Sequence, residues 1–271
     1  MIIIPNAKGV TGQTVSTSDY VLVPPRGSVA RHMERYASAM GANPFFRAVI
    51  QQAYSMFRAA GLHEVCDTFG FTARSAPDSL INWIPGGPVP IVNGAVWSSD
   101  IGWTTDGVDQ MVDLGIGPGG KFQRDSGHIA VFSTNPPEVN NAVALGRTAN
   151  STSFIMPVTA SGRSGARLNS SSTATAVNSS RMHGDIIANR RSPGAFRILS
   201  RGNLLISAEI ESTDLGGAGS SHFALGTGSS GGGYYPSVVA GWSIGGGLSD
   251  AQEQALSAIM GLLGARFAPM P

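Results

Sequence analysis

The chain has 271 residues, of which 42% are hydrophobic and 13% are charged, and its formal net charge is +1. This content of apolar side chains can bury a core, which excludes a disordered chain, and the absence of Ala/Glu/Lys/Leu/Arg enrichment excludes a coiled coil. The 36 glycines have no three-residue period, which excludes collagen, and the single cysteine, Cys66, excludes a disulfide-stapled scaffold.

Residues 1–27 are predicted to form an arm. Ile2, Ile3 and Ile4 would form a short strand with both faces apolar, which needs cover from the body of the protein or from a partner. Three apolar residues before Pro5 make neither a signal peptide nor a membrane span, and no later stretch is long and apolar enough to cross a bilayer. We therefore expect synthesis in a cytoplasm and no membrane insertion.

Residues 28–60 are predicted to form two amphipathic helices. Ser28 is a good N-cap for the first, and Asn43-Pro44 starts the second after Gly41. A third short helix is expected over 62–69. Because two helices bury little surface alone, this hairpin is expected to pack on another part of the structure.

From residue 128 onward, apolar and polar residues alternate with a period of two, which is typical of strands. Turn-rich segments separate these runs, so the pattern predicts a sandwich or barrel in preference to a parallel α/β sheet. Two Ser/Gly-rich stretches, 161–180 and 226–233, are predicted to be loops of one domain. The predicted strands are 128–133, 142–147, 153–158, 195–200, 204–212, 222–226 and 238–244.

The chain ends in one well-marked helix. Ser249 is its expected N-cap, and Gln252 three residues later completes a capping box. Ala255, Ile259 and Leu262 lie on its apolar face. We expect this helix to pack across the sheet or against the N-terminal helices.

Several segments resemble the concanavalin A-like (laminin G-like) jelly rolls of phage tail fibres and related particles, such as the head spikes of gene transfer agents. The resemblance covers roughly residues 62–266 in patches and departs from the usual pattern at Thr105, where the family has glycine. The matching segments are Leu-Ile-Asn-Trp at 80–83, Val-Asn-Gly at 92–94, Gly-Trp-Thr-Thr-Asp-Gly at 102–107, the loop at 119–126, the strand at 128–133, Gly-Trp-Ser-Ile-Gly at 241–245 and the segment 247–252 before the last helix.

The resemblance implies an antiparallel jelly-roll β-sandwich on the surface of a phage or phage-like particle. The matching motifs are structural, and none is catalytic. Such proteins usually carry an attachment module before a recognition domain. We therefore expect an attachment region over 1–70 and a jelly-roll domain with its C-terminal helix over 71–271.

The charge of the chain is unevenly distributed. Between Arg147 and Arg201 there are eight arginines and one acidic residue, Asp185, so this segment carries +7 in a chain whose total is +1. Such segregation attracts anions, and the guanidinium fork fits carboxylate, sulfate or phosphate. The pattern favours an acidic-glycan site that includes Arg163, Arg167, Arg190 and Arg191. The alternative is that these arginines spread over both faces and only solvate the sandwich.

Tyr234 and Tyr235 follow three glycines and are candidates for contact with sugar rings, because an aromatic face packs on the C–H surface of a sugar. The alternative is that one ring packs inward and the other covers a sheet edge.

An enzyme is the competing interpretation. Glu209 and Glu211 have the spacing of two carboxylates on one side of a strand, and glycosidases use two carboxylates. The alternative is that these carboxylates form an exposed acidic edge, and no sequence feature near them indicates a sugar-binding cleft.

Asp106, Asp109 and Asp113 have the oxygen ligands that Ca²⁺ prefers, but they match no EF-hand. The five histidines have no metal-ligand spacing.

The sequence therefore predicts a non-enzymatic spike or fibre protein without metal or cofactor. It would attach to other virion proteins through its N-terminal region, including Ile2–Ile4, and would bind host capsular polysaccharide, for example an acidic one. A symmetric homo-oligomer is expected, assembled in the bacterial cytoplasm and placed on the particle surface, with no nucleic-acid partner. The alternatives are a purely structural virion component and a glycan hydrolase.

Overall fold

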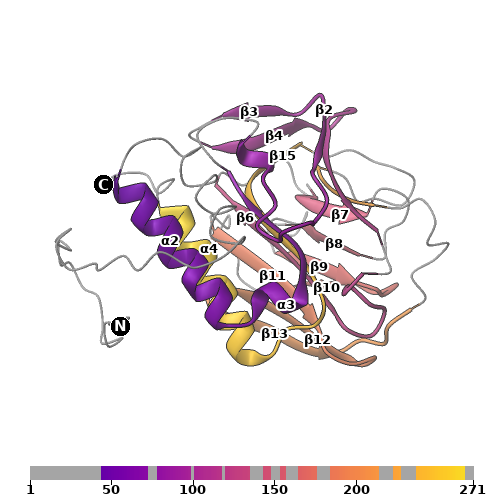
Figure 1. Ribbon diagram of the computed structural model, residues 1–271. Helices are drawn as coiled ribbons and strands as arrows, with labels where there is room; N and C mark the ends of the chain where they lie inside the picture. Colours follow the sequence, from indigo (N-terminus) through magenta and orange to yellow (C-terminus); the bar gives the residue numbers. More distant parts are fainter. Residues whose placement is uncertain are drawn as a thin grey trace.

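In the computed structural model, two antiparallel sheets face each other and helices cover one of them (Figure 1). This arrangement confirms the predicted class, a mainly β antiparallel sandwich with a C-terminal helix. No described helix is long and apolar enough to cross a bilayer. The structure describes residues 44–72, 78–98, 101–117, 120–134, 143–147, 153–156, 164–175, 184–213, 222–226 and 236–265.

Sheet A has the strand order β13-β12-β11-β6-β15-β4-β3, and β1 pairs with β15 beside this path. The long strand β15, near the end of the chain, therefore pairs with three strands from its first half, β1, β4 and β6. The strands of sheet A are β1 (Cys66–Phe71), β3 (Val96–Ser98), β4 (Gly102–Asp106), β6 (Gly127–Ser133), β11 (Gly184–Arg190), β12 (Ala195–Ser200), β13 (Asn203–Glu209) and β15 (Pro236–Gly245).

Sheet B has the order β10-β9-β8-β7-β14-β5-β2. Alternate residues of its strands face sheet A and form the interior of the sandwich, where Val112, Leu145, Ile155 and Phe223 pack with Trp242 of sheet A. The strands of sheet B are β2 (Ile91–Asn93), β5 (Met111–Ile116), β7 (Leu145–Arg147), β8 (Ser153–Met156), β9 (Gly165–Leu168), β10 (Ala174–Thr175) and β14 (Phe223–Leu225).

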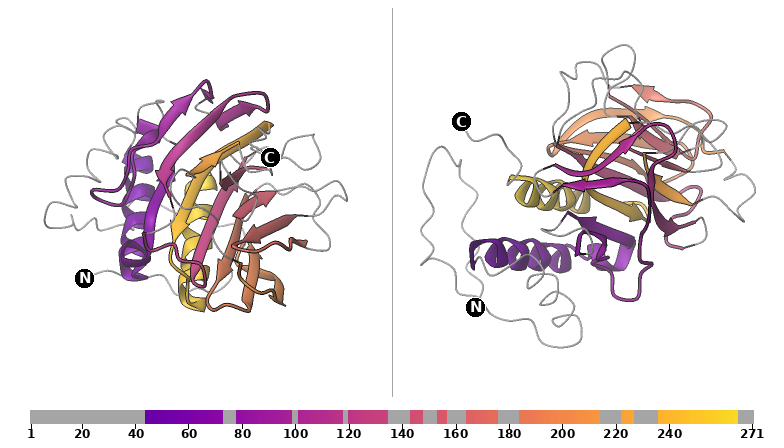
Figure 2. Two further views of the ribbon diagram at one scale, coloured as in Figure 1. Left: turned by 90° about the vertical axis from the view of Figure 1, so that its right-hand side faces the viewer. Right: turned by 90° about the horizontal axis from the view of Figure 1, so that it is seen from above.

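Helices α2 (Pro44–Ala59) and α4 (Asp250–Gly264) lie side by side on the outer face of sheet A (Figure 2). Their apolar faces form a second core, in which Phe57 and Ile259 pack with Ile187 and Leu199 of the sheet. Sheet A is thus buried on both faces, by sheet B on one side and by helices on the other. Helix α4 thus packs on both sheet A and helix α2, the two alternatives that the sequence predicts.

The helix starts and several strands agree closely with the sequence. Asn43-Pro44 precedes α2, and Ser249 caps α4 with the predicted capping box, in which Ser249 and Gln252 bond reciprocally. Strand β12 coincides with the predicted run 195–200, and β6 and β15 extend the predicted runs by one to three residues.

The prediction of a helix over 62–69 is wrong beyond its first turn. Helix α3 (Leu62–Val65) is short, and β1 follows at once because Cys66–Phe71 pairs with β15. The expected domain boundary at 70/71 therefore falls inside a strand. The described part of the N-terminal region packs in the same core as α4.

Candidate functional site

Six of the predicted site residues lie outside the described residues, namely Ile2, Ile3, Ile4, Arg163, Tyr234 and Tyr235. The described arginines of the predicted anion site occupy three different environments. Arg190 is in the interior, Arg191 lies at the start of α4, and Arg167 lies on the outer face of sheet B. The structure therefore does not bring these three side chains into one site.

The prediction that Arg190 binds a glycan is wrong, because its side chain is buried. Its Nε donates to the Leu168 carbonyl at 3.0 Å, and its Nη1 donates to the carbonyls of Ile210, at 2.7 Å, and Pro193. The guanidinium also lies over the Phe196 ring, 5.8 Å from its centroid. Arg190 therefore ties strand ends of both sheets together.

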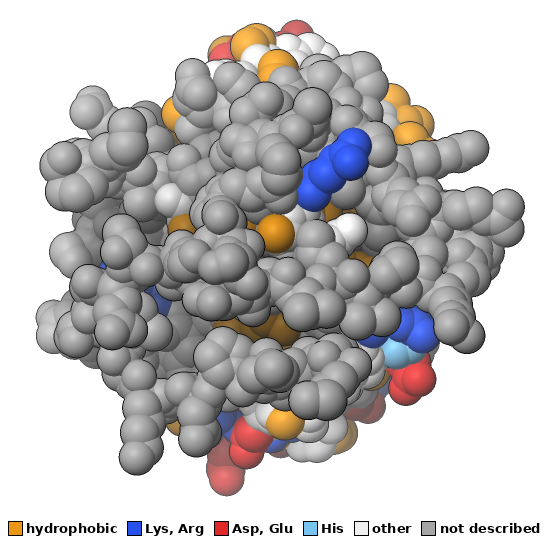
Figure 3. Space-filling model, turned by 60° about the vertical axis from the view of Figure 1, so that its left-hand side comes forward, with side chains coloured by type: hydrophobic (Ala, Val, Ile, Leu, Met, Phe, Trp, Pro, Cys, Tyr) orange, Lys and Arg blue, Asp and Glu red, His pale blue; other side chains and the backbone are white. Residues whose placement is uncertain are grey.

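Arg191 is also engaged within the protein. It lies 2.5 Å from Asp250 and 2.8 Å from Glu253, while Arg197 lies 3.2 Å from Glu253 and also contacts Asp250. Hydrogen bonds from Arg191 and Arg197 hold the pKa of Asp250 below its usual range. Acidic residues in the first turn of α4 thus neutralise part of the positive charge of the arginine-rich segment 147–201. On the described part of the face in Figure 3, no broad basic patch is visible.

Arg167 is half-buried on the outer face of sheet B. It pairs across the sheet with Phe154, and its guanidinium lies 5.0 Å from the centroid of that ring. Nε and Nη2 donate to Thr173 Oγ1 at 3.1 and 2.8 Å. The neighbouring pair, Ile155 and Ala166, faces the interior, so Arg167 and Phe154 face outward.

Cross-strand register extends this pair into one row over the outer face of sheet B. Phe154 lies opposite Gly146, Gly146 opposite Ala224, and Ala224 opposite Asp113. Four strand spacings separate Asp113 from Arg167, which is about 19 Å. We call Asp113, Ala224, Gly146, Phe154 and Arg167 the outer row.

The two ends of the outer row are polar and partly exposed, whereas its middle is buried and small. At one end, Asp113 Oδ2 lies 3.3 Å from His222 Nδ1, and these side chains are 20% and 47% exposed. At the other end is Arg167, which is half-buried, while Phe154, Gly146 and Ala224 are buried. The centre of the row is therefore covered, and only its two ends reach solvent.

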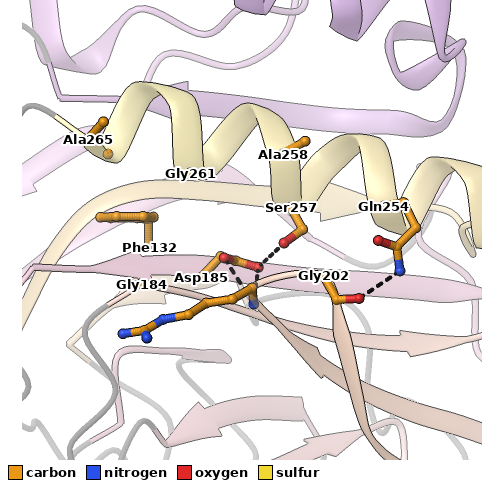
Figure 4. A pocket seen from close by; sticks show the side chains of 11 residues that line it. Phe132, Gly184, Asp185, Gly202, Gln254, Ser257, Ala258, Gly261 and Ala265 are labelled. Carbon is orange, nitrogen blue, oxygen red and sulfur yellow. Dashed lines mark hydrogen bonds between the residues drawn. The ribbon is translucent and has the colours of Figure 1, made fainter. Parts of the chain in front are cut away.

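A pocket of about 500 Å³ lies elsewhere, between the C-terminal half of α4 and the ends of sheet A strands (Figure 4). On the sheet side, Asp185 and Phe132 lie directly opposite each other on β11 and β6. Ser257 donates to Asp185 Oδ2 at 2.7 Å, and the Arg201 backbone N–H donates to both carboxylate oxygens at 3.2 Å. Burial raises the pKa of the Asp185 carboxyl above its ordinary value, against these hydrogen bonds.

The turn between β12 and β13 closes this pocket. Arg201 and Gly202 have φ of 50° and 73°, the left-handed pair that a tight two-residue hairpin turn requires. Arginine is an unusual residue there, and the contacts to the Asp185 carboxylate hold it in place. Gln254 of α4 donates to the Gly202 carbonyl at 2.8 Å, which fixes the turn to the helix.

Neither a metal site nor a hydrolytic pair stands out. Within the described parts of the chain, no three His, Cys, Asp or Glu side chains cluster to hold a metal ion. Asp106 Oδ1 accepts from the Val108 backbone N–H at 2.9 Å, the bond that chiefly holds the pKa of Asp106 below its usual range. Glu209 ends β13, and Glu211 lies beyond it, both exposed.

No protein-family model matches this chain, and a search of curated proteins finds no match. Solved structures do match. The binding domain of botulinum neurotoxin serotype D has a TM-score of 0.50 and 10% identity over 72% of this chain and 52% of its own. Trypanosoma rangeli sialidase in complex with 2,3-difluorosialic acid has a TM-score of 0.50 and 12% identity over 86% of this chain and 38% of its own.

A third similar structure is domain 4 of an extracellular arabinanase from Geobacillus stearothermophilus in complex with arabinotriose, with a TM-score of 0.46 and 14% identity over 71% of this chain and 98% of its own. The similarities to the toxin domain and to the sialidase, each with a TM-score of 0.50, agree with the fold, an antiparallel β-sandwich. The chain spans about half of the toxin domain and well under half of the sialidase.

Sequence reasoning found Arg167 but missed its partners in the outer row. Phe154 stands next to Ile155 in an apolar run, and only the register of β8 and β9 reveals that Phe154 faces outward. The sequence marks Asp113 only as a candidate calcium ligand. The isolated acid Asp185 was visible in the arginine-rich segment, but its position opposite Phe132 depends on the pairing of β6 and β11.

Proposed function

We propose that this protein is a surface component of a phage or phage-like particle and that its sandwich binds host cell-surface polysaccharide. Support comes from the sequence resemblance and from the fold, which is shared with a neurotoxin binding domain and with a sialidase described in complex with a sialic acid derivative. A shared fold does not by itself assign a function. The proposal therefore depends on the chemistry of one face.

The observation that carries the proposal is the outer row. The outer face of sheet A is covered by α2 and α4, whereas no described helix packs on the outer face of sheet B. The row offers a guanidinium over an aromatic ring at one end and a carboxylate with an imidazole at the other. Saccharides are bound by such charged groups, because these bond to sugar hydroxyls and carboxylates.

The two ends favour different parts of a glycan. Arg167 suits a uronic-acid carboxylate, since arginine binds carboxylates through two parallel hydrogen bonds. Asp113 suits hydroxyl donors. An acidic polysaccharide that alternates charged and neutral sugars therefore fits the row better than a uniformly neutral one.

In this proposal the N-terminal region, residues 1–70, attaches the protein to other virion components on the particle surface. Single-site glycan binding is weak, and several copies on one particle raise the overall affinity through avidity. A symmetric homo-oligomer is therefore part of the proposal. Light scattering of the purified full chain tests it, and a monomer at micromolar concentration would count against it.

Binding needs no covalent step, so we propose that the protein is not an enzyme. Release of reducing ends from the bound polysaccharide, lost in Glu209→Gln or Glu211→Gln, would favour the hydrolase alternative instead.

The direct test uses the purified full chain on host cells with and without capsule, and on immobilised polygalacturonate and dextran. The expected result is retention on capsulated cells and on the polyuronate, weaker at high salt because charge pairs are screened. Equal retention on capsulated and bare cells would contradict glycan binding and favour a purely structural virion component.

A further inference from the structure

We propose that strand β13 is the contact surface through which two copies of this chain associate, with the two strands paired antiparallel so that sheet A continues from one copy into the other. This inference rests on the homo-oligomer of the proposed function and names the strand that forms it. It does not depend on the outer row, because β13 forms one border of sheet A (Figure 1).

Strand β13 is long for a strand at the border of a sheet. The other border strands, β3 of sheet A and β2 and β10 of sheet B, have three residues or fewer. Strand β1 is covered, since Asn82 Oδ1 accepts from the Phe69 N–H at 3.2 Å and the Trp83 N–H donates to the Phe69 carbonyl at 2.8 Å. Proteins usually shorten or cover such strands, because free backbone groups pair with other chains. Within the described chain, no segment pairs with the free edge of β13.

The free edge of β13 has backbone donors and acceptors ready for pairing. The Ile210 N–H donates to the Gly194 carbonyl at 2.9 Å, on the β12 side. Consecutive residues of an antiparallel strand turn their N–H and C=O groups to opposite sides, so Ala208 also bonds toward β12, whereas Ser207 and Glu209 turn away from it. Both residues are exposed. They can therefore exchange N–H···O=C bonds with the same residues of a second copy.

The side chains of β13 are apolar on both faces of the sheet. Leu204 lies opposite Leu199 on the helix-covered face and is 49% exposed. Leu205 and Ile206 pack against the core between the two sheets but are only partly buried. A strand with two apolar faces needs a neighbour, and a second β13 would remove more of this apolar surface from water.

The charges around β13 favour a second copy in the antiparallel direction. Arg201 stands just before the strand, Glu209 ends it and Glu211 follows, and all three residues are exposed. The run Asn203–Ala208 between them carries no charge. Arg201 also attracts the Asp185 carboxylate of its own chain, and its exposure leaves it accessible to a further acidic group. Antiparallel pairing places the basic start of each strand beside the acidic end of the other, on one self-complementary surface.

The test measures the mass of the full chain by light scattering at micromolar concentration for wild type, Leu204→Lys and the matched control Val96→Lys. Val96 is 60% exposed on β3, at the opposite border of sheet A. We expect a dimer for wild type and Val96→Lys and a monomer for Leu204→Lys, because a lysine on a border strand opposes pairing. A dimer that persists in Leu204→Lys, or that is lost in Val96→Lys instead, would overturn the assignment.

Hydrogen exchange of the wild-type protein keeps the proposal testable if Leu204→Lys does not fold. The N–H groups of Ser207 and Glu209 should exchange slowly in the dimer and faster on dilution to the monomer. Slow exchange in a monomer would mean that the chain covers its own edge, and fast exchange in a monomer would leave the edge to another protein. Either result would overturn both this inference and the proposed homo-oligomer. An oligomer in which these amides exchange fast would overturn this inference alone.

Discussion

His128 Nε2 lies 2.8 Å from Ser243 Oγ in a fully buried polar chain between β6 and β15. His128 Nδ1 lies 2.6 Å from the Gly246 carbonyl, which can only accept, so Nδ1 carries the proton and Nε2 accepts from Ser243. Cys66 Sγ, 3.5 Å from Ser243 Oγ, then donates to that oxygen. In this arrangement the imidazole is neutral, and each of its two ring nitrogens has a partner.

This arrangement predicts a loss of stability in mild acid. Burial lowers the pKa of His128 to about 4 from its ordinary 6.5, against the hydrogen bond to Gly246. The unfolded chain therefore binds a proton that the folded protein does not between pH 6.5 and 4, and the free energy of unfolding falls as pH falls through this window. The contribution of His128 should drop by about 2 kcal/mol from pH 7 to pH 5.

Urea titrations at pH 7 and pH 5 measure this contribution when wild type is compared with His128→Gln and with the exposed control His222→Gln. The free energy of unfolding should depend less on pH in His128→Gln than in wild type, whereas His222→Gln should behave like wild type. Equal pH dependence in all three proteins would show that His128 does not carry it.

Cys66 should be inert in the folded protein. Burial raises the pKa of its thiol to about 12, so the reactive thiolate is almost absent at pH 8. Because the sequence contains one cysteine, a chromogenic thiol reagent should label nothing in native buffer and one thiol per chain in guanidinium chloride. Rapid labelling of the native protein would refute the buried placement of β1 against β15.

Two acidic residues at the start of α4 should contribute differently to the free energy of unfolding. Glu253 is buried, bonds to Asn189 Nδ2 at 2.6 Å and pairs with Arg191 and Arg197, whereas the Asp250 side chain is 73% exposed. Glu253→Gln leaves two arginines without their buried counter-charge and should cost about 2 kcal/mol, allowing for their partial exposure. Asp250→Asn should cost at most about 1 kcal/mol. Chemical denaturation measures both, and equal costs would contradict this difference.

Two glycines of α4 should respond in opposite directions to alanine. Gly264→Ala places a methyl group on the Phe132 ring and should destabilise the protein by about 1–3 kcal/mol through overpacking. Gly261→Ala meets open space and should stabilise it by up to about 1 kcal/mol, because alanine favours helix. Thermal melts of both variants check the sign, and a stabilised Gly264→Ala would mean that α4 sits farther from the sheet.

The parts of the fold predictable from sequence are those with local signals. The capping box at Ser249 and the alternating run 195–200 were sufficient for α4 and β12. Strand β11 was missed because all seven of its residues are buried, between sheet B and the helices, so no alternation marks it. Strand β1 cannot be recognised locally, because the strand with which it pairs, β15, lies about 170 residues away.

The site was harder to predict for the same reason. Arg190 and Arg191 are adjacent in sequence and look equivalent, yet the end of β11 turns the first inward and leaves the second at the start of α4. Asp113 and Phe154 fall in one row with Arg167 only through the register of five strands of sheet B. Net charge along the chain could not separate internal from external arginines.

The most direct test of the central claim is calorimetric titration of an acidic oligosaccharide, such as an oligogalacturonate, into wild type, Arg167→Gln and Arg58→Gln. Arg58 is exposed on α2, over the helix-covered face, and is the matched control. The account predicts that Arg167→Gln weakens binding roughly tenfold, as for a lost charged hydrogen bond, and that Arg58→Gln binds like wild type. Equal affinities of wild type and Arg167→Gln, or a loss confined to Arg58→Gln, would contradict glycan binding on the outer face of sheet B.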